Sequence, residues 1–296
     1  MFSVTAGDPT RCGILAFMPT TKFWRSVEVL HDVVYFAPDA KARYEALGLK
    51  GYWMGYFASR SAPMGTPPPE MVIATFHGFA PRMVQRALPD AWSLASRDDI
   101  LTARLDLARD TLAPATEAEG ADTARVAREL AAIVSGFNLA GKPLAAAHAA
   151  LERPTDDTGL LWWAASAIRE YRGDCHIAVL TAAGLDGVSA NTLAVAAGLT
   201  AVEQRNMRGW TEDEWAAGYA QLASRGWVDA DGTITESGRS ARQQIEDATD
   251  RVCAAGMDRE ATGRAITVEE GLRTLARAVL KSGVVSFPNP TATQHP

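Results

Sequence analysis

Residues 211–253 restrict the fold more than any other part of the sequence. Thr211-Glu212-Asp213-Glu214 forms a capping box that opens a helix up to Arg225, and Gly226 follows it. Residues 227–235 then predict a strand, a Gly-containing turn and a second strand, and a further helix begins near Glu236. Short helices are expected before this stretch, at residues 189–197 and 201–207. Helix, turn, helix, hairpin and helix is the order of a winged helix.

The rest of the chain has helical periodicity. We predict a mainly α fold of two pseudo-repeated helical halves, the second a winged-helix variant with a small β-hairpin wing. The repeat rests on similar spacing after Trp24 and after Trp162, and on Trp92 and Trp210 further along each half. The predicted divisions are an N-terminal segment (1–21), a helical domain (22–112), a linker with bridging helices (113–157), a winged-helix-like domain (158–256), and a C-terminal helix and tail (257–296).

Composition and the missing motifs exclude several classes. The chain has 296 residues, 47% of them hydrophobic, which excludes a disordered chain, and a formal net charge of −6, which argues against a chain-wide polyanion binder. A secretory signal, a membrane span, CxxC pairs, GxGxxG, Walker A and GxSxG are not found. Cys12, Cys175 and Cys253 are widely spaced and support neither disulfides nor a zinc site. We therefore expect a soluble cytoplasmic protein with no cofactor, no metal and no membrane partner.

Two resemblances follow from short motifs. The run LASRGWVDADGTITESGRSARQQIE, residues 222–246, resembles the wing and the following helix of MarR-like winged-helix proteins. About residues 22–250 resemble an actinobacterial family of helix-turn-helix proteins. The motifs that carry this second resemblance are His31 with Tyr35-Phe36, GYWMGYF at 51–57, APMG at 62–65, RGD at 172–174 with His176, and RGW at 208–210. The resemblance implies a fold and no specific activity.

The winged helix has the wrong charge for DNA. Residues 211–236 contain six acidic side chains and one basic one, Arg225, which gives a net charge of −5. Recognition helices need Lys, Arg, Asn or Gln near their N-terminus, because acidic groups there repel the phosphate backbone. The basic alternative is Arg82, Gln85 and Arg86 on a short helix, where a solvated face is the simpler interpretation. We expect no nucleic-acid partner.

Three groups of residues could carry chemistry. The first is Arg169, Arg172, Asp174 and His176, at the end of a helix expected from about Gly159 to Tyr171 and in the turn before a short helix at Cys175–Ala183. These residues suit an anion and an acid–base step, although the same pattern fits a helix C-terminus with favourable cations. The second is His31, Asp32, Tyr35 and His77, in which His31 and Tyr35 share a helix face at i, i+4. Buried structural side chains are the alternative there.

The third group is aromatic, with cations beside it, and core packing is again the simpler alternative. It comprises Tyr52, Trp53, Tyr56 and Phe57 with Arg60, and the tryptophans Trp162, Trp163, Trp210, Trp215 and Trp227 with Arg208 beside Trp210.

The leading hypothesis is a small-molecule ligand bound in an aromatic cavity, lined by Arg and His, between the two halves. The candidate catalytic residues are His31, Tyr35, Asp174 and His176. The candidate ligand-binding residues are Arg60, His77, Arg172, Arg208, Trp53, Tyr56 and Trp210. Whether the chain is an enzyme stays open; the reaction class would be a cofactor-independent isomerase, cyclase or lyase in specialised metabolism. The alternatives are a ligand-responsive winged-helix transcriptional regulator and a purely structural interaction module, and a homodimer is left open.

Overall fold

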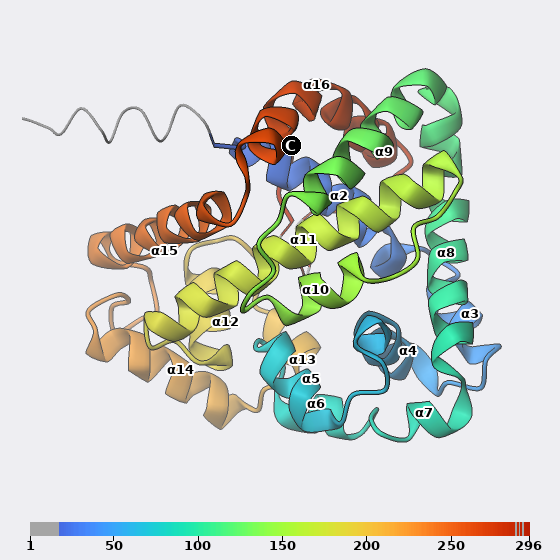
Figure 1. Cartoon of the computed structure of the whole chain (residues 1–296). Helices are drawn as coiled ribbons and strands as arrows, with labels where there is room; N and C mark the ends of the chain where they lie inside the picture. Colours follow the sequence, from blue (N-terminus) through green and yellow to red (C-terminus); the bar gives the residue numbers. More distant parts are fainter. Residues whose placement is uncertain (1–17, 288, 290, 292) are drawn as a thin grey trace, which may run out of the picture.

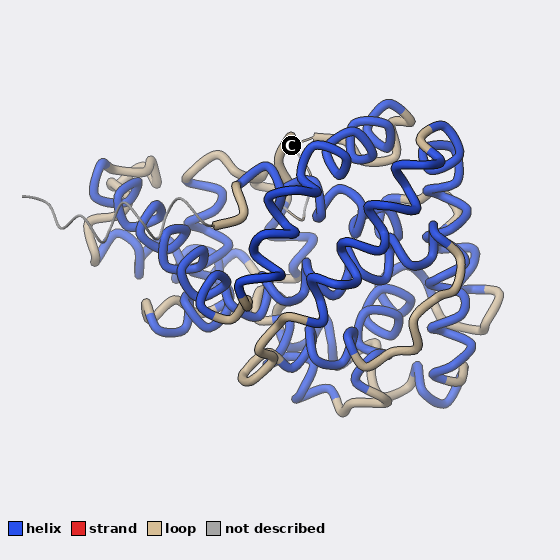
Figure 2. Tube along the Cα trace, turned by 45° about the horizontal axis from the view of Figure 1, so that its top comes forward, coloured by secondary structure: helices blue, strands red, loops and turns tan. Residues whose placement is uncertain are grey.

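The computed structural model describes residues 18–287, 289, 291 and 293–296. Within these residues every regular element is a helix (Figures 1 and 2). The mainly α prediction is confirmed. The elements are α2 (Thr21–Phe36), α3 (Ala40–Glu45), α4 (Gly51–Ser61), η1 (Ala62–Met64), α5 (Pro69–Phe76), α6 (Pro81–Gln85), α7 (Ala91–Leu94), α8 (Arg97–Ala118), α9 (Gly120–Ser135), α10 (Pro143–Ala149), α11 (Asp157–Ala182), α12 (Gly187–Ala196), α13 (Gln204–Arg208), α14 (Glu212–Ser224), α15 (Glu236–Ala255) and α16 (Arg259–Lys281).

The long helix α11 organises the molecule. It runs through the middle of Figure 1 and packs against α2, α8, α9, α10 and α15. The sequence predicted two helices here, with a turn at Arg172-Gly173-Asp174. The structure has one helix of 26 residues, because Arg172 and Asp174 find partners on neighbouring helices without the chain leaving its helical path.

Two hydrophobic cores divide the chain unequally. The larger core takes side chains from Phe23 to Val285, whereas the smaller core is built from Leu180, Leu185, Leu193, Leu222, Val228 and Ile245. We call residues 179–245, which surround the smaller core, the small lobe, and the rest of the described chain the main lobe. The larger core thus draws on both predicted halves, which differs from the expected pair of similar halves. The predicted domain boundaries stay predictions.

The predicted β-hairpin wing is wrong. Residues 227–235 contain one isolated antiparallel bridge, Val228 with Ile234, and the described chain has no strand. The Asp229 carboxylate accepts hydrogen bonds from the Asp231 and Thr233 amides, 3.0 and 2.9 Å, which closes the turn tightly. Thr235 already caps α15 through the Gly238 amide. Only Trp227 and Val228 before the turn face Ile234 and Thr235 after it, which is too short for two paired β-strands.

The expected linker at residues 113–120 is also helical in the structure. Helix α8 continues to Ala118 with Pro114 inside it, and only Glu119 separates α8 from α9. Leu112 and Ala115 are buried on its inner face. Burial of this apolar stripe stabilises the last turns of α8 despite the hydrogen bond that a proline removes.

The small lobe sits against residues 77–80 of the main lobe. The Arg208 carbonyl accepts a hydrogen bond from the Ala80 amide, 2.9 Å, and the Asn191 amide group donates to the Gly78 carbonyl, 2.7 Å. Gly187 is required by this contact, since a Cβ there would lie 2.2 Å from the His77 carbonyl oxygen. The first turn of α12 is therefore fixed directly against the end of α5.

No single helix of the described residues has the length and apolar character to cross a bilayer. Helices α11 and α12 have them only when taken together, and the two are bent by 100°. The cytoplasmic location and the homodimer stay predictions.

Candidate functional site

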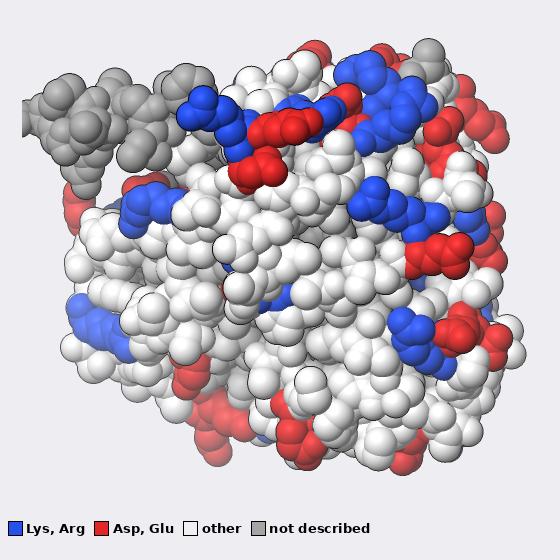
Figure 3. Space-filling view, in the orientation of Figure 1, with Lys and Arg blue, Asp and Glu red and all other residues white. Residues whose placement is uncertain are grey.

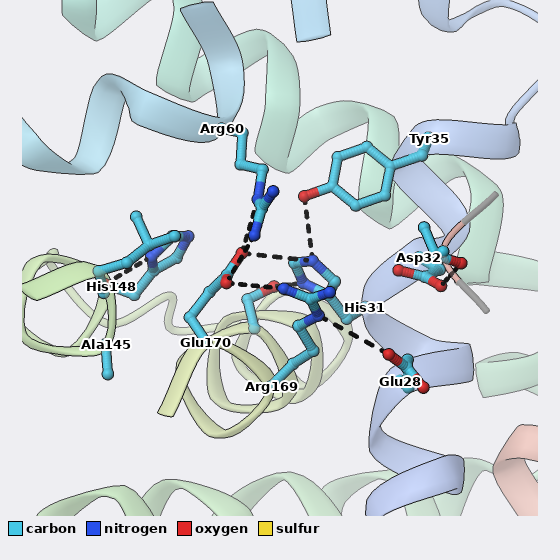
Figure 4. Close-up of polar contacts among 12 residues, drawn as sticks. Glu28, His31, Asp32, Tyr35, Arg60, Ala145, His148, Arg169 and Glu170 are labelled. Carbon is cyan, nitrogen blue, oxygen red and sulfur yellow. Dashed lines mark hydrogen bonds and ion pairs between the residues drawn. The ribbon is translucent and has the colours of Figure 1, made fainter. Parts of the chain in front are cut away.

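Helices α2, α4, α8 and α11 bring polar side chains into the interior of the main lobe (Figure 4). We call this set the buried polar cluster; it consists of His31, Tyr35, Arg60, Arg104, Ser166 and Glu170. All six side chains are buried among the apolar residues of the larger core. Burying a charged side chain costs free energy unless an opposite charge or hydrogen bonds compensate it. The protonation states of the six side chains therefore depend on the contacts within the cluster.

Arg60 and Glu170 form a bidentate ion pair at its centre. Nε and Nη2 of Arg60 donate to the two carboxylate oxygens, each at 3.0 Å, and Nη1 of Arg169 donates to Oε2 of Glu170 at 2.8 Å. Burial alone would raise the pKa of Glu170, but the guanidinium groups of Arg60 and Arg169 hold it well below its ordinary value. Glu170 is therefore a permanent carboxylate.

A hydrogen-bonded chain runs from Arg104 to Ser166. Nη2 of Arg104 donates to the Tyr35 hydroxyl at 3.0 Å, which leaves the Tyr35 proton to donate to Nε2 of His31 at 3.0 Å. Nδ1 of His31 then carries a proton and donates to Oγ of Ser166 at 2.9 Å. This tautomer is assigned from the network. Burial lowers the pKa of His31 well below its ordinary value, and nearby Glu170 only partly opposes this, so His31 is neutral.

Arg104 is a buried cation whose hydrogen-bond partners are neutral. Besides Tyr35 it donates to the Ser59 carbonyl at 2.7 Å, and its guanidinium lies 5.2 Å from the Trp162 ring. Its Nε atom is buried without a hydrogen-bond partner. The positive charge of Arg104 is thus stabilised by dipoles and an aromatic face rather than by a carboxylate.

An aromatic wall borders the cluster on the side of α4. The Tyr56 hydroxyl accepts from Nη1 of Arg60 at 3.1 Å, and Trp53, Tyr56 and Phe79 contact one another at ring-centroid distances of 5.5 to 6.0 Å. The guanidinium of Arg208 lies 4.3 Å from the Phe79 ring and hydrogen-bonds Tyr56. Burial lowers the pKa of Arg208, with Tyr56 opposing.

The cluster reaches the surface beside α2. Arg169 faces Glu28, with Nε and Oε1 3.9 Å apart and only 20% and 26% of the two side chains exposed. Burial, followed by the charge of Asp32, raises the pKa of Glu28 to about 7. Asp32 is itself buried and accepts hydrogen bonds from Thr291, at 2.7 Å, and from Thr293 of the C-terminal tail. Glu28 is the acid of this edge that titrates near neutrality.

The structure brings several predicted site residues together. His31, Tyr35 and Arg60 belong to the buried polar cluster, and Trp53, Tyr56 and Arg208 form the wall beside it. Trp210 and His77 lie at the lobe contact, where Nε1 of Trp210 donates to the Gly78 carbonyl at 3.3 Å and His77 has a φ of 44°. Whether these residues carry a function stays a prediction.

The remaining candidates point to other helices. Asp174 accepts from the Leu144 and Ala145 amides, 3.0 and 2.9 Å, and so caps α10. Arg172 pairs with Glu246 and Asp250 of α15, 2.8 and 2.6 Å, and His176 contacts Thr249 there at 3.0 Å. Arg172, Asp174 and His176 of α11 thus bind α10 and α15 to this helix.

Sequence reasoning missed Arg104, Glu170, Glu28 and Ser166. A signal existed for the first two. Arg104 falls on the same helical stripe as the buried Ile100 and Leu107, and Glu170 on that of the buried Trp163 and Ala167. A charge on an apolar stripe indicates a buried partner.

A groove of about 730 Å³ lies elsewhere, between α9, residues 153–155 and the start of α16. A smaller one of about 320 Å³ lies near Pro38 and Gly283. Neither groove is lined by residues of the buried polar cluster, and the predicted aromatic cavity stays a prediction. No three His, Cys, Asp or Glu side chains converge as a metal site within the described residues.

Helix α14 presents an acidic N-terminus. Its first turn holds Glu212, Asp213 and Glu214, and the predicted capping box between Thr211 and Glu214 is confirmed. Figure 3 shows acidic side chains along the lower edge of the molecule, over α14 and α6. Arg82 of α6 pairs with Glu214, and Arg205 pairs with Glu212 at 3.0 Å. Of the alternative DNA-contact group Arg82, Gln85 and Arg86, Arg82 is therefore engaged within the protein.

Comparison with known proteins gives one match. The sequence model of the helix-turn-helix family matches residues 20–286. The chain belongs to the helix-turn-helix family. No curated protein and no solved structure matches it. The resemblance to helix-turn-helix proteins is thereby confirmed, whereas its actinobacterial and MarR-like details stay predictions.

In this helix-turn-helix protein, α12 and α14 pack against each other, and the short helix α13 lies between them in the chain. The exposed residues of α14 are Glu212, Asp213, Ala216, Ala217, Ala220, Ala223 and Ser224. None of them is a base, and the first basic side chain after α14, Arg225, donates to the Ala183 and Gly184 carbonyls. Helix α14, which the sequence predicts as the recognition helix, thus exposes no basic side chain; the absence of a nucleic-acid partner stays a prediction.

Proposed function

We propose that this helix-turn-helix protein binds a small organic anion at the Arg169–Glu28 edge of the buried polar cluster, and that it does not read DNA with α14. One observation carries the proposal. Two guanidinium groups, those of Arg60 and Arg169, share one permanent carboxylate, Glu170, while the guanidinium of Arg104 bonds only neutral groups. An anionic ligand is the complement of this excess positive charge.

Stability alone is a poor explanation for such a cluster. Buried ion pairs contribute about as much to stability as well-packed hydrophobic residues, or less. Perturbed titrating groups gather preferentially at functional sites. The cluster contains a neutral histidine, an ionised glutamate and, at its rim, a glutamate whose pKa is raised to about 7.

Access to the cluster is best at Arg169 and Glu28. Their separation of 3.9 Å is longer than a hydrogen bond, and both side chains are partly exposed. A carboxylate, sulfonate or phosphate group can bind the guanidinium of Arg169 there, while the protonated form of Glu28 donates a hydrogen bond to it. The same proton on Glu28 is available for acid–base chemistry near neutral pH. An isomerase, cyclase or lyase step without a cofactor fits this arrangement.

Family membership favours a second candidate, a ligand-responsive transcriptional regulator. DNA contacts are the common use of paired helices of this kind. The acidic first turn of α14 and the pairing of Glu214 with Arg82 count against it. A regulator of this family would have to contact phosphates through another surface.

Thermal unfolding with a panel of small carboxylates, sulfonates and phosphates tests the proposal. At least one anion is expected to raise the melting temperature of the wild-type protein and to lose that effect in Arg169→Gln. Arg109→Gln is the matched control, because Arg109 pairs with Asp156 at the surface, outside the cluster. An equal shift in Arg169→Gln would place the anion elsewhere. Retention on duplex DNA that weakens with salt, without any anion effect, would favour the regulator.

A further inference from the structure

Two cysteines from distant parts of the chain meet where α11 crosses α15. Cys175 and Cys253 are each about 1% exposed, and their thiols are hydrogen-bonded to each other. Tyr171 fixes the α15 backbone at this point, since its hydroxyl donates to the Cys253 carbonyl at 2.7 Å. The two sulfur atoms are therefore held together by helix packing, although 77 residues separate them in the chain.

The pair lies at the junction of the two cores. Both cysteines belong to the larger core, whereas Leu180, further along α11, and Ile245, earlier on α15, belong to the smaller one. Helices α11 and α15 are thus the two stems that connect the small lobe to the main lobe. All of the small lobe, residues 179–245, falls between the two cysteines.

Cations stand beside the pair. Nη1 of Arg172 lies 4.0 Å from Sγ of Cys253, while the same guanidinium pairs with Asp250 and Glu246. The hydrogen bond from the Cys253 thiol lowers the pKa of Cys175, and the charges of Lys142 and Arg172 act in the same direction against burial. A thiolate on Cys175 with Cys253 as the adjacent thiol supplies the two sulfur atoms that an attacking and a resolving cysteine need; because both are about 1% exposed, the oxidant must be as small as hydrogen peroxide.

We propose that Cys175 and Cys253 form a redox-active dithiol that hydrogen peroxide converts into a disulfide across the base of the small lobe. The Cys175 thiolate attacks one peroxide oxygen, whose O–O bond breaks; the hydroxide that leaves takes up a proton. Cys175 is then a sulfenic acid. The Cys253 sulfur attacks the Cys175 sulfur, forms the S–S bond and expels water. The dithiol loses two electrons and two protons, and the peroxide is reduced to water.

The disulfide would join α11 and α15, the two helices that connect the small lobe to the main lobe. A disulfide limits the freedom of the unfolded chain most when it closes a long loop, and here the loop contains the whole small lobe. Oxidation is therefore expected to slow proteolysis within residues 179–245. The proposed redox-active dithiol is independent of the proposed anion site, which lies on α2 and on the preceding turns of α11.

Peroxide treatment of the folded, full-length Cys12→Ser protein tests the proposal. Removing Cys12 leaves Cys175 and Cys253 as the two remaining cysteines. Peptide mapping without reductant is expected to show the 175–253 crosslink with loss of two hydrogen atoms. Dithiothreitol should restore both thiols, and the melting temperature should rise by several degrees in the oxidised form, roughly the effect of a long-loop disulfide.

The variant Cys12→Ser/Cys253→Ser separates the two steps. Without the resolving thiol, oxidation should stop at a sulfenic acid on Cys175 that dimedone labels, and no crosslink should form. The proposal is overturned if the folded Cys12→Ser protein keeps both thiols through the treatment. It is equally overturned if the 175–253 crosslink forms only in denaturant, since the native helices would then not bring the sulfur atoms together.

Discussion

Arg82 on α6 and Glu214 on α14 form two parallel hydrogen bonds, Nη1 to Oε1 at 2.9 Å and Nη2 to Oε2 at 2.5 Å. Nη2 of Arg82 also donates to the Gly209 carbonyl. Hydrogen bonding by Arg82, with help from the Thr211 amide, lowers the pKa of Glu214 to about 2. The N-terminus of α14, the predicted recognition helix, is thus attached to the main lobe by its own acidic residue.

A double-mutant cycle measures this attachment. Arg82→Ala and Glu214→Gln are each expected to destabilise the protein slightly, with a coupling energy of about 0.5–1 kcal/mol, because both side chains are partly exposed and the geometry is bidentate. Urea unfolding at low and high salt gives the coupling, which should shrink with salt. Lys41 and Glu45, an exposed i, i+4 pair, serve as the control. A coupling no larger than that of the control pair would contradict this role of Arg82.

Removing Arg60 tests the charge balance of the buried polar cluster. Arg60→Met leaves the Glu170 carboxylate buried with one cation fewer, and should lower the free energy of unfolding by about 3–5 kcal/mol. The double variant Arg60→Met/Glu170→Leu should lose less than the sum of the two single variants, since it removes both charges. Arg109→Met, at the exposed Asp156 pair, should cost under about 1 kcal/mol. Strict additivity of the Arg60 and Glu170 effects would show that the pair is not coupled.

Local patterns in the sequence predicted part of this structure correctly. The mainly α class, the capping box at Thr211–Glu214 and the i, i+4 contact between His31 and Tyr35 all depend on residues within four positions of one another. Contacts between residues so close in sequence form within one helix, and tertiary packing leaves them in place. The use of these residues is a separate question, which local patterns leave open.

The parts that sequence reasoning missed are those set by distant partners. Glu170 is stabilised by Arg60, 110 positions away, and Arg104 reaches Tyr35 across 69 positions. The turn expected at Arg172-Gly173-Asp174 is absent because α10 and α15 supply partners for its side chains. The predicted wing is wrong for a local reason that the sequence contains. Thr235, expected in the second strand, caps α15 instead.

Tyr35→Phe tests the hydrogen-bonded chain from Arg104 to His31. Loss of the hydroxyl removes a partner from Nη2 of Arg104 and from Nε2 of His31, both buried. The expected cost in unfolding free energy is about 1–3 kcal/mol, and the ring nitrogen NMR signals of His31 should shift. Tyr52→Phe, which removes one 3.2 Å bond to a half-buried carbonyl, should cost less. Unchanged His31 signals would contradict the assigned chain.

His148 should make the stability depend on pH in a predictable direction. Its Nδ1 bonds the Leu144 carbonyl at 2.9 Å, and burial, followed by the charge of Arg104, lowers its pKa from 6.5 to about 4. Between these values the unfolded chain binds a proton that the folded protein does not, so this contribution to stability is present above the unfolded pKa and is lost as the pH falls. His148→Phe removes the titration. Relative to wild type, the variant should therefore gain about 2 kcal/mol on going from about pH 7 to about pH 5.

Comparing the change between two pH values cancels whatever packing the phenylalanine gains or loses. Trp163→Phe is the matched control, because Trp163 donates to the His148 carbonyl at 3.1 Å but does not titrate. Its difference from wild type should be the same at both pH values. Urea unfolding of wild type and the two variants at each pH supplies the six free energies. A pH-independent difference for His148→Phe would show that His148 takes up its proton equally in the folded and unfolded chains, against its burial beside Arg104.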